Sequence, residues 1–361
     1  MARVPAVLLL LVLALLPCAS ADARQRARLF AADSIWNAAL PADARLDDSS
    51  PARVSALTQE IASEVDSGIG PWISEREYST PIYTVPAATP QVAVTLDTGS
   101  WGDPLRTALA AGVPIPDSAR PAPGSDGHLT VYQPATDTLW EFWRAIRRPD
   151  GWHASWGGAM RNVSASPGYY DDASWTGLDA RQGWNWGSTA TSLPVAAGTV
   201  TIAELRRGRI DHALAMAVPD TCEKLFSWPA QRTDGSSDAP DCLPAGAHLR
   251  LDPKLDISRL GLPRVTRQLA RAAQRYGIVV RDRTHHAVGF YAEDPARTGT
   301  DPYRGPQGLY GDLDPWEFLP RFPWQRLQLL QMRVCDAAPC PAPPDNSSRS
   351  ASHRAPTAAG E

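Results

Sequence analysis

The sequence predicts a mainly β protein, an antiparallel β-sandwich or jelly roll with a few peripheral helices. Short runs of β-branched and aromatic residues recur between segments rich in Pro, Gly and Asp. Helical spacing of apolar residues is confined to a few stretches, and no internal repeat or low-complexity linker divides the chain. These observations favour one sheet-rich domain over several smaller ones.

The N-terminus has the features of a secretory signal peptide. Residues 4–16 are apolar, follow Arg3 and precede Ala19-Ser20-Ala21, which predicts cleavage after Ala21. We therefore expect a secreted, extracellular protein with a signal peptide at 1–21, a single β-rich domain at 22–340 and a disordered, Pro- and Ser-rich tail at 341–361. Cys18 leaves a lipoprotein anchor as an alternative, although Pro17 fits such processing poorly.

Charge and hydropathy exclude several classes of partner. The chain has 35 basic and 39 acidic residues, which gives no electrostatic reason to bind nucleic acid or an anionic membrane surface. No stretch after the leader approaches about 18 apolar residues, so we expect no membrane insertion once the signal is removed.

The cysteines predict disulfides and not a metal site. The four that follow the leader favour two bonds in an exported chain, most simply Cys222–Cys242 and Cys335–Cys340, although three connectivities are open. No C-x-x-C or H-E-x-x-H spacing predicts a metal, and we expect no cofactor. A structural calcium held by Asp171 and Asp172 is an alternative that spacing does not support.

The first regular elements are a helix and two short strands. Ser50-Pro51 offers a cap and a first-turn proline, and the apolar spacing that follows predicts a helix ending at Gly68. Residues 82–85 and 91–97 alternate as strands do.

Residues 124–161 predict a three-stranded meander over about 127–133, 138–145 and 151–157. With turns centred near 135–136 and 148–149, one face carries a carboxylate, an imidazole, a phenol and indoles: His128, Thr130, Tyr132, Glu141, Trp143, Trp152 and Trp156. Such a face suits a sugar, whose C–H groups stack on aromatic rings while its hydroxyls need polar partners. A one-residue slip at the second turn would remove Trp152 and Trp156, and core tryptophans are the alternative interpretation.

Later segments add further candidates. A capping box, Thr201-x-x-Glu204, precedes a predicted strand at 209–218, where His212 is either a core histidine or a general base. Within the predicted ring from Cys222 to Cys242, Arg232 and Asp234 could recognise an acidic sugar, or could pair with each other in a surface loop.

The C-terminal third predicts one helix and three strands. Residues 247–252, 278–281 and 288–293 have strand patterns, and 263–276 has helical spacing that ends at Gly277. His285 and His286 lie between two of these strands, where a lone histidine pair is more often a solvated turn than a metal site.

Several blocks resemble a family of secreted, uncharacterised proteins of high-GC bacteria: DGHL, WEFW, WGG, IDHAL, WPAQRTDG, GAHLRLDP and YGIVVRD. This resemblance covers about residues 30–330 and implies no named activity. In outline the chain also resembles the jelly-roll class of lectins, glucanases and polysaccharide lyases, which implies a fold but no catalytic residue.

The sequence therefore predicts a secreted carbohydrate-active protein that cleaves a polysaccharide or cell-wall glycan. Hydrolysis would use Glu141 with Asp126 or Asp234 as its partner, whereas β-elimination would use His128, His212 or Tyr132 as base and Arg232 on a sugar carboxylate. A non-catalytic carbohydrate-binding or cell-surface protein is the alternative. A serine hydrolase is disfavoured because the chain has no G-x-S-x-G motif.

Overall fold

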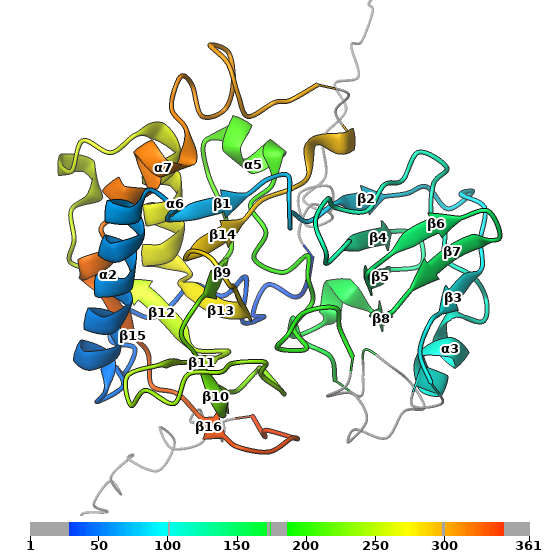
Figure 1. Cartoon of the computed structure of the whole chain (residues 1–361), viewed down its shortest axis with the longest axis horizontal. Coiled ribbons are helices and arrows are strands. Elements are labelled where there is room, and N and C mark those ends of the chain that lie inside the picture. The colour runs from blue at the N-terminus through cyan, green and yellow to red at the C-terminus, as the bar shows by residue number, and fades with distance from the viewer. Residues whose placement is uncertain (1–28, 100–101, 172–173, 175–185, 298–299, 343–361) are drawn as a thin grey trace, which may run out of the picture.

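The computed structural model describes residues 29–99, 102–171, 174, 186–297 and 300–342 (Figure 1). Two sheet-containing halves lie side by side in that view, with most of the helices on the outside of one half. The predicted leader and nearly all of the predicted tail lie outside the described residues.

One half is built on a six-stranded mixed sheet in the order β1-β14-β9-β13-β12-β15. Its strands are β1 (Trp72–Ser74), β9 (Leu214–Val218), β12 (His248–Leu251), β13 (Ile278–Arg283), β14 (Gly289–Tyr291) and β15 (Leu327–Leu329). The pairs β1/β14 and β9/β13 are parallel, and the other pairs are antiparallel.

Helices pack on one face of this sheet. They include α2 (Ser50–Ser67), α5 (Ile202–Arg207), α6 (Arg264–Arg275) and α7 (Pro315–Phe318), with short 3-10 turns at Ile257–Arg259, Pro295–Arg297, Leu319–Arg321 and Trp324–Arg326. Proline in the first turn and Gly68 in the left-handed region bound α2, as the sequence predicts. The Thr201–Glu204 capping box of α5 is likewise confirmed.

The other half contains two smaller sheets, in the orders β2-β4-β5-β8 and β3-β7-β6. Their strands are β2 (Ile82–Thr84), β3 (Val94–Leu96), β4 (Leu129–Gln133), β5 (Thr138–Trp143), β6 (Ile146–Arg148), β7 (Gly151–Ala154) and β8 (Trp156–Arg161), accompanied by α3 (Asp103–Leu109) and a 3-10 turn at Val163–Ala165.

The register predicted for the first hairpin is confirmed, and that of the second is wrong. Thr130 lies opposite Glu141, but Glu141 faces Gly158 and not Trp156, which instead faces Trp143. A turn does form, one residue later than predicted, at 149–150, but it closes a separate hairpin, β6/β7, whose strand β7 pairs with β3. The chain leaves the first sheet after Trp143 and returns at β8, so Trp152 belongs to another sheet.

Two apolar cores lie on opposite faces of the six-stranded sheet. On β9, Leu214, Met216 and Val218 pack with the helices, whereas Ala213, Ala215 and Ala217 pack with the core of the other half. This alternation is the one that the sequence predicts, although the strand begins at Leu214 and leaves His212 outside it. The small alanines allow the two halves to approach closely.

Both predicted disulfides are confirmed, Cys222–Cys242 and Cys335–Cys340. They lie at the third small sheet, whose strands are β10 (Thr221–Ser227), β11 (Leu243–Ala245) and β16 (Val334–Cys335). No helix among the described residues is long and apolar enough to cross a membrane.

The prediction of a sheet-rich fold with few helices is therefore confirmed, and the arrangement is compatible with a β-sandwich. A jelly-roll strand order is not confirmed.

Candidate functional site

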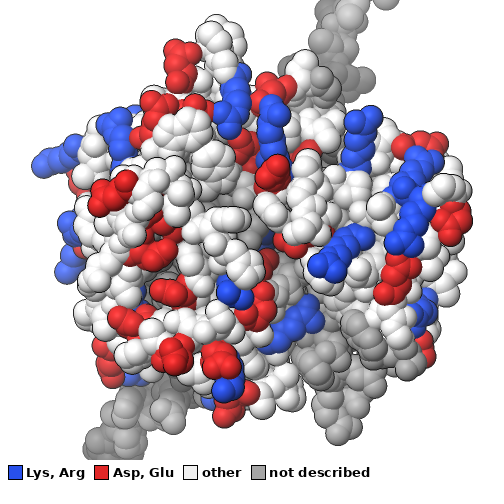
Figure 2. Space-filling model, viewed as in Figure 1, with Lys and Arg blue, Asp and Glu red and all other residues white. Residues whose placement is uncertain are grey.

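Charged side chains from distant parts of the chain meet where the two halves adjoin. We call Asp126, His128, Arg232, Asp234, Arg281 and Asp282 the seam cluster. They come from the approach to β4, the loop after β10 and the end of β13. Figure 2 shows acidic and basic side chains next to each other along the line between the halves.

Among the carboxylates of the seam cluster, Asp282 has the most strongly shifted pKa. Its pKa is raised to about 7, mainly by removal from water; the Arg281 charge opposes the increase, and the charges of Asp234 and Asp126 contribute to it. Its side chain is only partly buried and accepts a hydrogen bond from the Arg283 backbone N–H at 3.0 Å. A partly exposed residue therefore carries a carboxyl group that holds a proton near neutral pH.

The other two seam carboxylates are held by neighbouring side chains. Asp126 accepts a hydrogen bond from the Trp143 indole N–H at 3.2 Å, and the Arg144 guanidinium lies 4.2 Å from the centre of that ring. Asp234 is exposed, and its backbone carbonyl accepts a hydrogen bond from Arg283 at 3.2 Å. The first contact orients the Asp126 carboxylate, and the second holds the Asp234 backbone beside the end of β13.

His128 is buried beside Asp126 and Arg281. Its pKa is lowered to about 4, mainly by burial; the Asp126 charge opposes the decrease, and the Arg281 charge contributes to it. One ring nitrogen lies 3.4 Å from the Phe142 carbonyl oxygen. The imidazole is therefore neutral at physiological pH and can act as a hydrogen-bond donor or acceptor.

Two arginines provide buried positive charge. Arg281 is completely buried, donates to the backbone carbonyls of Val195 and Ala197, and lies 3.9 Å from the Tyr291 ring centre. Arg232 donates to the Thr189 carbonyl at 2.7 Å, and burial lowers its pKa to about 10 while the Asp282 and Glu141 charges oppose that shift. Both guanidiniums thus hold the buried segment 186–199 and balance the acids around them.

Glu141 has a different environment from the seam carboxylates. It is completely buried, and its two oxygens accept hydrogen bonds of 2.7 Å from the backbone N–H groups of Ser188 and Val195. Burial raises its pKa, and these hydrogen bonds oppose the increase. The side chain therefore anchors the segment 186–199 to β5.

The remaining predicted residues are not brought together in one site. Trp152 and Trp156 are buried in the core, as the alternative interpretation held, and the Tyr132 hydroxyl donates to Asp137 at 3.0 Å. His212 pairs with Glu204 at 3.0 Å, and that carboxylate raises the histidine pKa against the effect of burial. His212 therefore stabilises the region after α5.

The sequence interpretation missed Arg281 and Asp282. Both follow an apolar run, Ile278 to Val280, so the signal was a charged pair at the end of a buried strand. Neither residue lies near the meander in sequence, and only the fold brings the pair to Asp126 and His128.

No metal site is evident in the described part of the chain. No group of three or more His, Cys, Asp or Glu side chains there could hold an ion. Asp171 accepts a hydrogen bond from the Ser174 N–H, whereas Asp172 lies outside the described residues. His285 and His286 are exposed on their turn.

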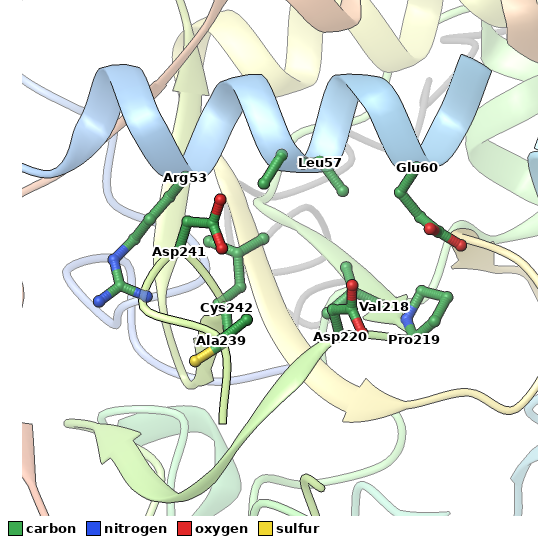
Figure 3. Close-up of a pocket in the computed structure, with 11 residues that line it drawn as sticks. Arg53, Leu57, Glu60, Val218, Pro219, Asp220, Ala239, Asp241 and Cys242 are labelled. Atoms are coloured by element: carbon green, nitrogen blue, oxygen red, sulfur yellow. The ribbon is translucent and has the colours of Figure 1, made fainter. Parts of the chain in front are cut away.

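A second acidic group lines a small pocket between α2 and the end of β9 (Figure 3). Glu60, Asp220 and Asp241 line it together with Arg53. The space amounts to about 30 Å³, enough for roughly one or two waters. It is too small for a sugar.

Comparison with protein-family models, curated proteins and solved structures finds no match for this chain.

Proposed function

We propose that this protein is exported and hydrolyses a polysaccharide at the seam cluster, with Asp282 as the proton donor. The observation that carries the proposal is a carboxyl group with a pKa raised to about 7, on a partly exposed residue and beside two further carboxylates. A general acid is most effective when its pKa lies close to the working pH. The leader, the disulfides and the absence of a membrane-spanning helix in the described residues support export.

Glycoside hydrolysis requires a second carboxylate beside the acid. Asp126 suits this role because it is partly exposed and the Trp143 indole orients it. In this mechanism Asp282 transfers its proton to the departing glycosidic oxygen. Water then attacks the anomeric carbon, and Asp126 accepts the proton that the water loses.

The buried neighbours would control protonation. Arg281 limits the negative charge that three carboxylates create, and the neutral His128 adds no further positive charge there. Glu141 takes no part in proton transfer, because both of its oxygens are bound to backbone N–H groups.

The test is release of new reducing ends from a panel of neutral and acidic polysaccharides. Asp282→Asn should reduce release by the mature protein by about 100-fold or more, whereas Asp66→Asn, at an exposed position on α2, should not change it. New ultraviolet absorbance in the products would indicate elimination and contradict hydrolysis. Absence of release from every substrate would instead favour the carbohydrate-binding alternative.

A further inference from the structure

An open pocket of about 540 Å³ lies on the outside of the helical half, away from the seam cluster. It lies between the end of α5, the first turn of α6 and the turn at 301–309, the orange segment above α5 in Figure 1. Three arginines and one aspartate contribute its charges: Arg206, Arg264, Arg304 and Asp301.

The pocket has an excess of positive charge. Asp301, its acidic residue, is already paired with Arg76 at 2.5 Å. Arg304 is paired with Glu75 at 3.0 Å and with Asp314. Arg206 and Arg264 form no ion pair with any described side chain, so their charges are available to a ligand.

The two available guanidiniums are positioned differently. Arg264 donates to the backbone carbonyls of Leu205 and Arg206, at 2.9 and 3.2 Å, which holds its side chain across the end of α5. Arg206 is exposed at the same helix end. A planar guanidinium held in this way favours bidentate contact with a carboxylate or sulfate.

The opposite wall is a folded turn. Backbone hydrogen bonds join Leu309 to Pro302 at 2.9 Å and Tyr310 to Tyr303 at 3.0 Å, and the two tyrosine rings lie 5.1 Å apart in the core. Gln307 and Gly308 of this turn line the pocket. Both walls are therefore formed before a ligand binds, which reduces the entropy cost of binding.

We propose that this arginine pocket binds an acidic saccharide through a carboxylate or sulfate group. The volume is far larger than an inorganic anion needs and lies within the range of pockets that hold small organic ligands. Two guanidiniums, an amide and backbone polar groups match an anionic ring with several hydroxyls. The pocket is separate from the seam cluster, so binding does not depend on the proposed hydrolysis.

The experiment measures binding of trigalacturonate, a sulfated trisaccharide, neutral maltotriose and inorganic phosphate to the mature protein by calorimetry. The test variant is Arg206→Gln/Arg264→Gln. The matched control is Arg271→Gln/Arg275→Gln, which removes two exposed arginines of α6 that do not line the pocket.

One or both acidic trisaccharides should bind, maltotriose should not, and the test variant should weaken binding by roughly tenfold or more, as expected for charge-assisted hydrogen bonds. The control should change the affinity by less than about twofold, because surface charges outside a site contribute little. Arg206→Gln alone should also weaken binding, and its exposed position makes a folding defect an inadequate explanation.

Equal weakening by the test and control variants would overturn the proposal, as would equal binding of maltotriose. Phosphate that binds as tightly as the acidic trisaccharides would reduce the pocket to a general anion site and overturn the saccharide assignment. Asp282→Asn should leave the affinity unchanged. An unchanged affinity would show that binding by the arginine pocket can be tested separately from hydrolysis at the seam cluster.

Discussion

Glu141 and Asp282 are both carboxylates with raised pKa values near the junction of the two halves, yet their surroundings differ. Glu141 is enclosed, and both of its oxygens accept backbone hydrogen bonds. Asp282 is partly accessible, and the neighbouring Asp126 and Asp234 contribute to its shift. A raised pKa therefore identifies a chemical site only when solvent or a ligand can reach the group.

The largest effect that we expect is loss of activity in Asp282→Asn. Removal of a general acid should lower kcat/KM by about 100-fold or more. Wild-type activity should fall as pH rises through about 7, since Asp282 must be protonated to act and its pKa is about 7. The pH–rate profile of the residual activity should lack this decrease. An unchanged alkaline limb in the variant would assign the ionisation to another group.

Glu141→Ala should mainly reduce stability. It leaves the backbone N–H groups of Ser188 and Val195 without their acceptor, at a cost of about 1–3 kcal/mol each. We expect the free energy of unfolding to fall by about 3 kcal/mol in urea melts, with Glu223→Ala, at an exposed position on β10, as a near-neutral control. If Glu141→Ala kept full stability but lost activity, Glu141 would be a catalytic group and not the structural anchor that we assign.

Glu64 is a third carboxylate with a raised pKa, and it predicts how the stability of the fold depends on pH. Burial raises its pKa to about 7, and one oxygen accepts from the Val288 N–H at 2.6 Å while the other has no hydrogen-bond partner in the structure. Because the folded pKa is above the ordinary value of 4.5, stability should decrease as pH rises from about 4.5 to about 7 and then level off.

Glu64→Gln should remove this contribution, which is on the order of 2 kcal/mol after allowance for solvent screening. The measurement is the difference in unfolding free energy between wild type and variant at pH 4.5 and pH 7.5. A difference that does not change with pH would show that Glu64 is not the titrating group.

The smallest effect should come from Trp143→Phe. It removes the indole N–H that donates to Asp126 at 3.2 Å while retaining an aromatic ring. We expect kcat/KM to fall by about two- to fivefold, since one such hydrogen bond contributes about 1 kcal/mol. Trp316→Phe is the matched control, because that ring is half exposed, stacks on Trp72 and belongs to α7, which lies in the other half from β4 and β5 (Figure 1). Equal effects in both variants would contradict an orienting role.

Local patterns predicted the elements whose signals lie within a few residues of each other. The proline and glycine that bound α2, the Thr201–Glu204 box and the alternation of β9 all appear as expected. The first hairpin was also correct because a short turn sets its register. The second was not, since no pattern indicates that an inserted hairpin joins β3.

The candidate site could be predicted only in part. Asp126, His128, Arg232 and Asp234 were singled out from local chemistry, but Glu141 received a catalytic role that its buried hydrogen bonds argue against. The composition of a strand face indicates which groups are present. It does not indicate whether another segment, here 186–199, covers them.

By itself the sequence indicated the sheet-rich class, favoured the two disulfide pairs that form and set the ends of α2, α5 and α6, because turn chemistry, short cysteine spacing and periodicity act over short distances. Only the tertiary structure decided which carboxylates share the seam with Asp282. That choice depends on how the two halves pack across the alanine face of β9, and contacts between residues more than 100 positions apart have no local signal.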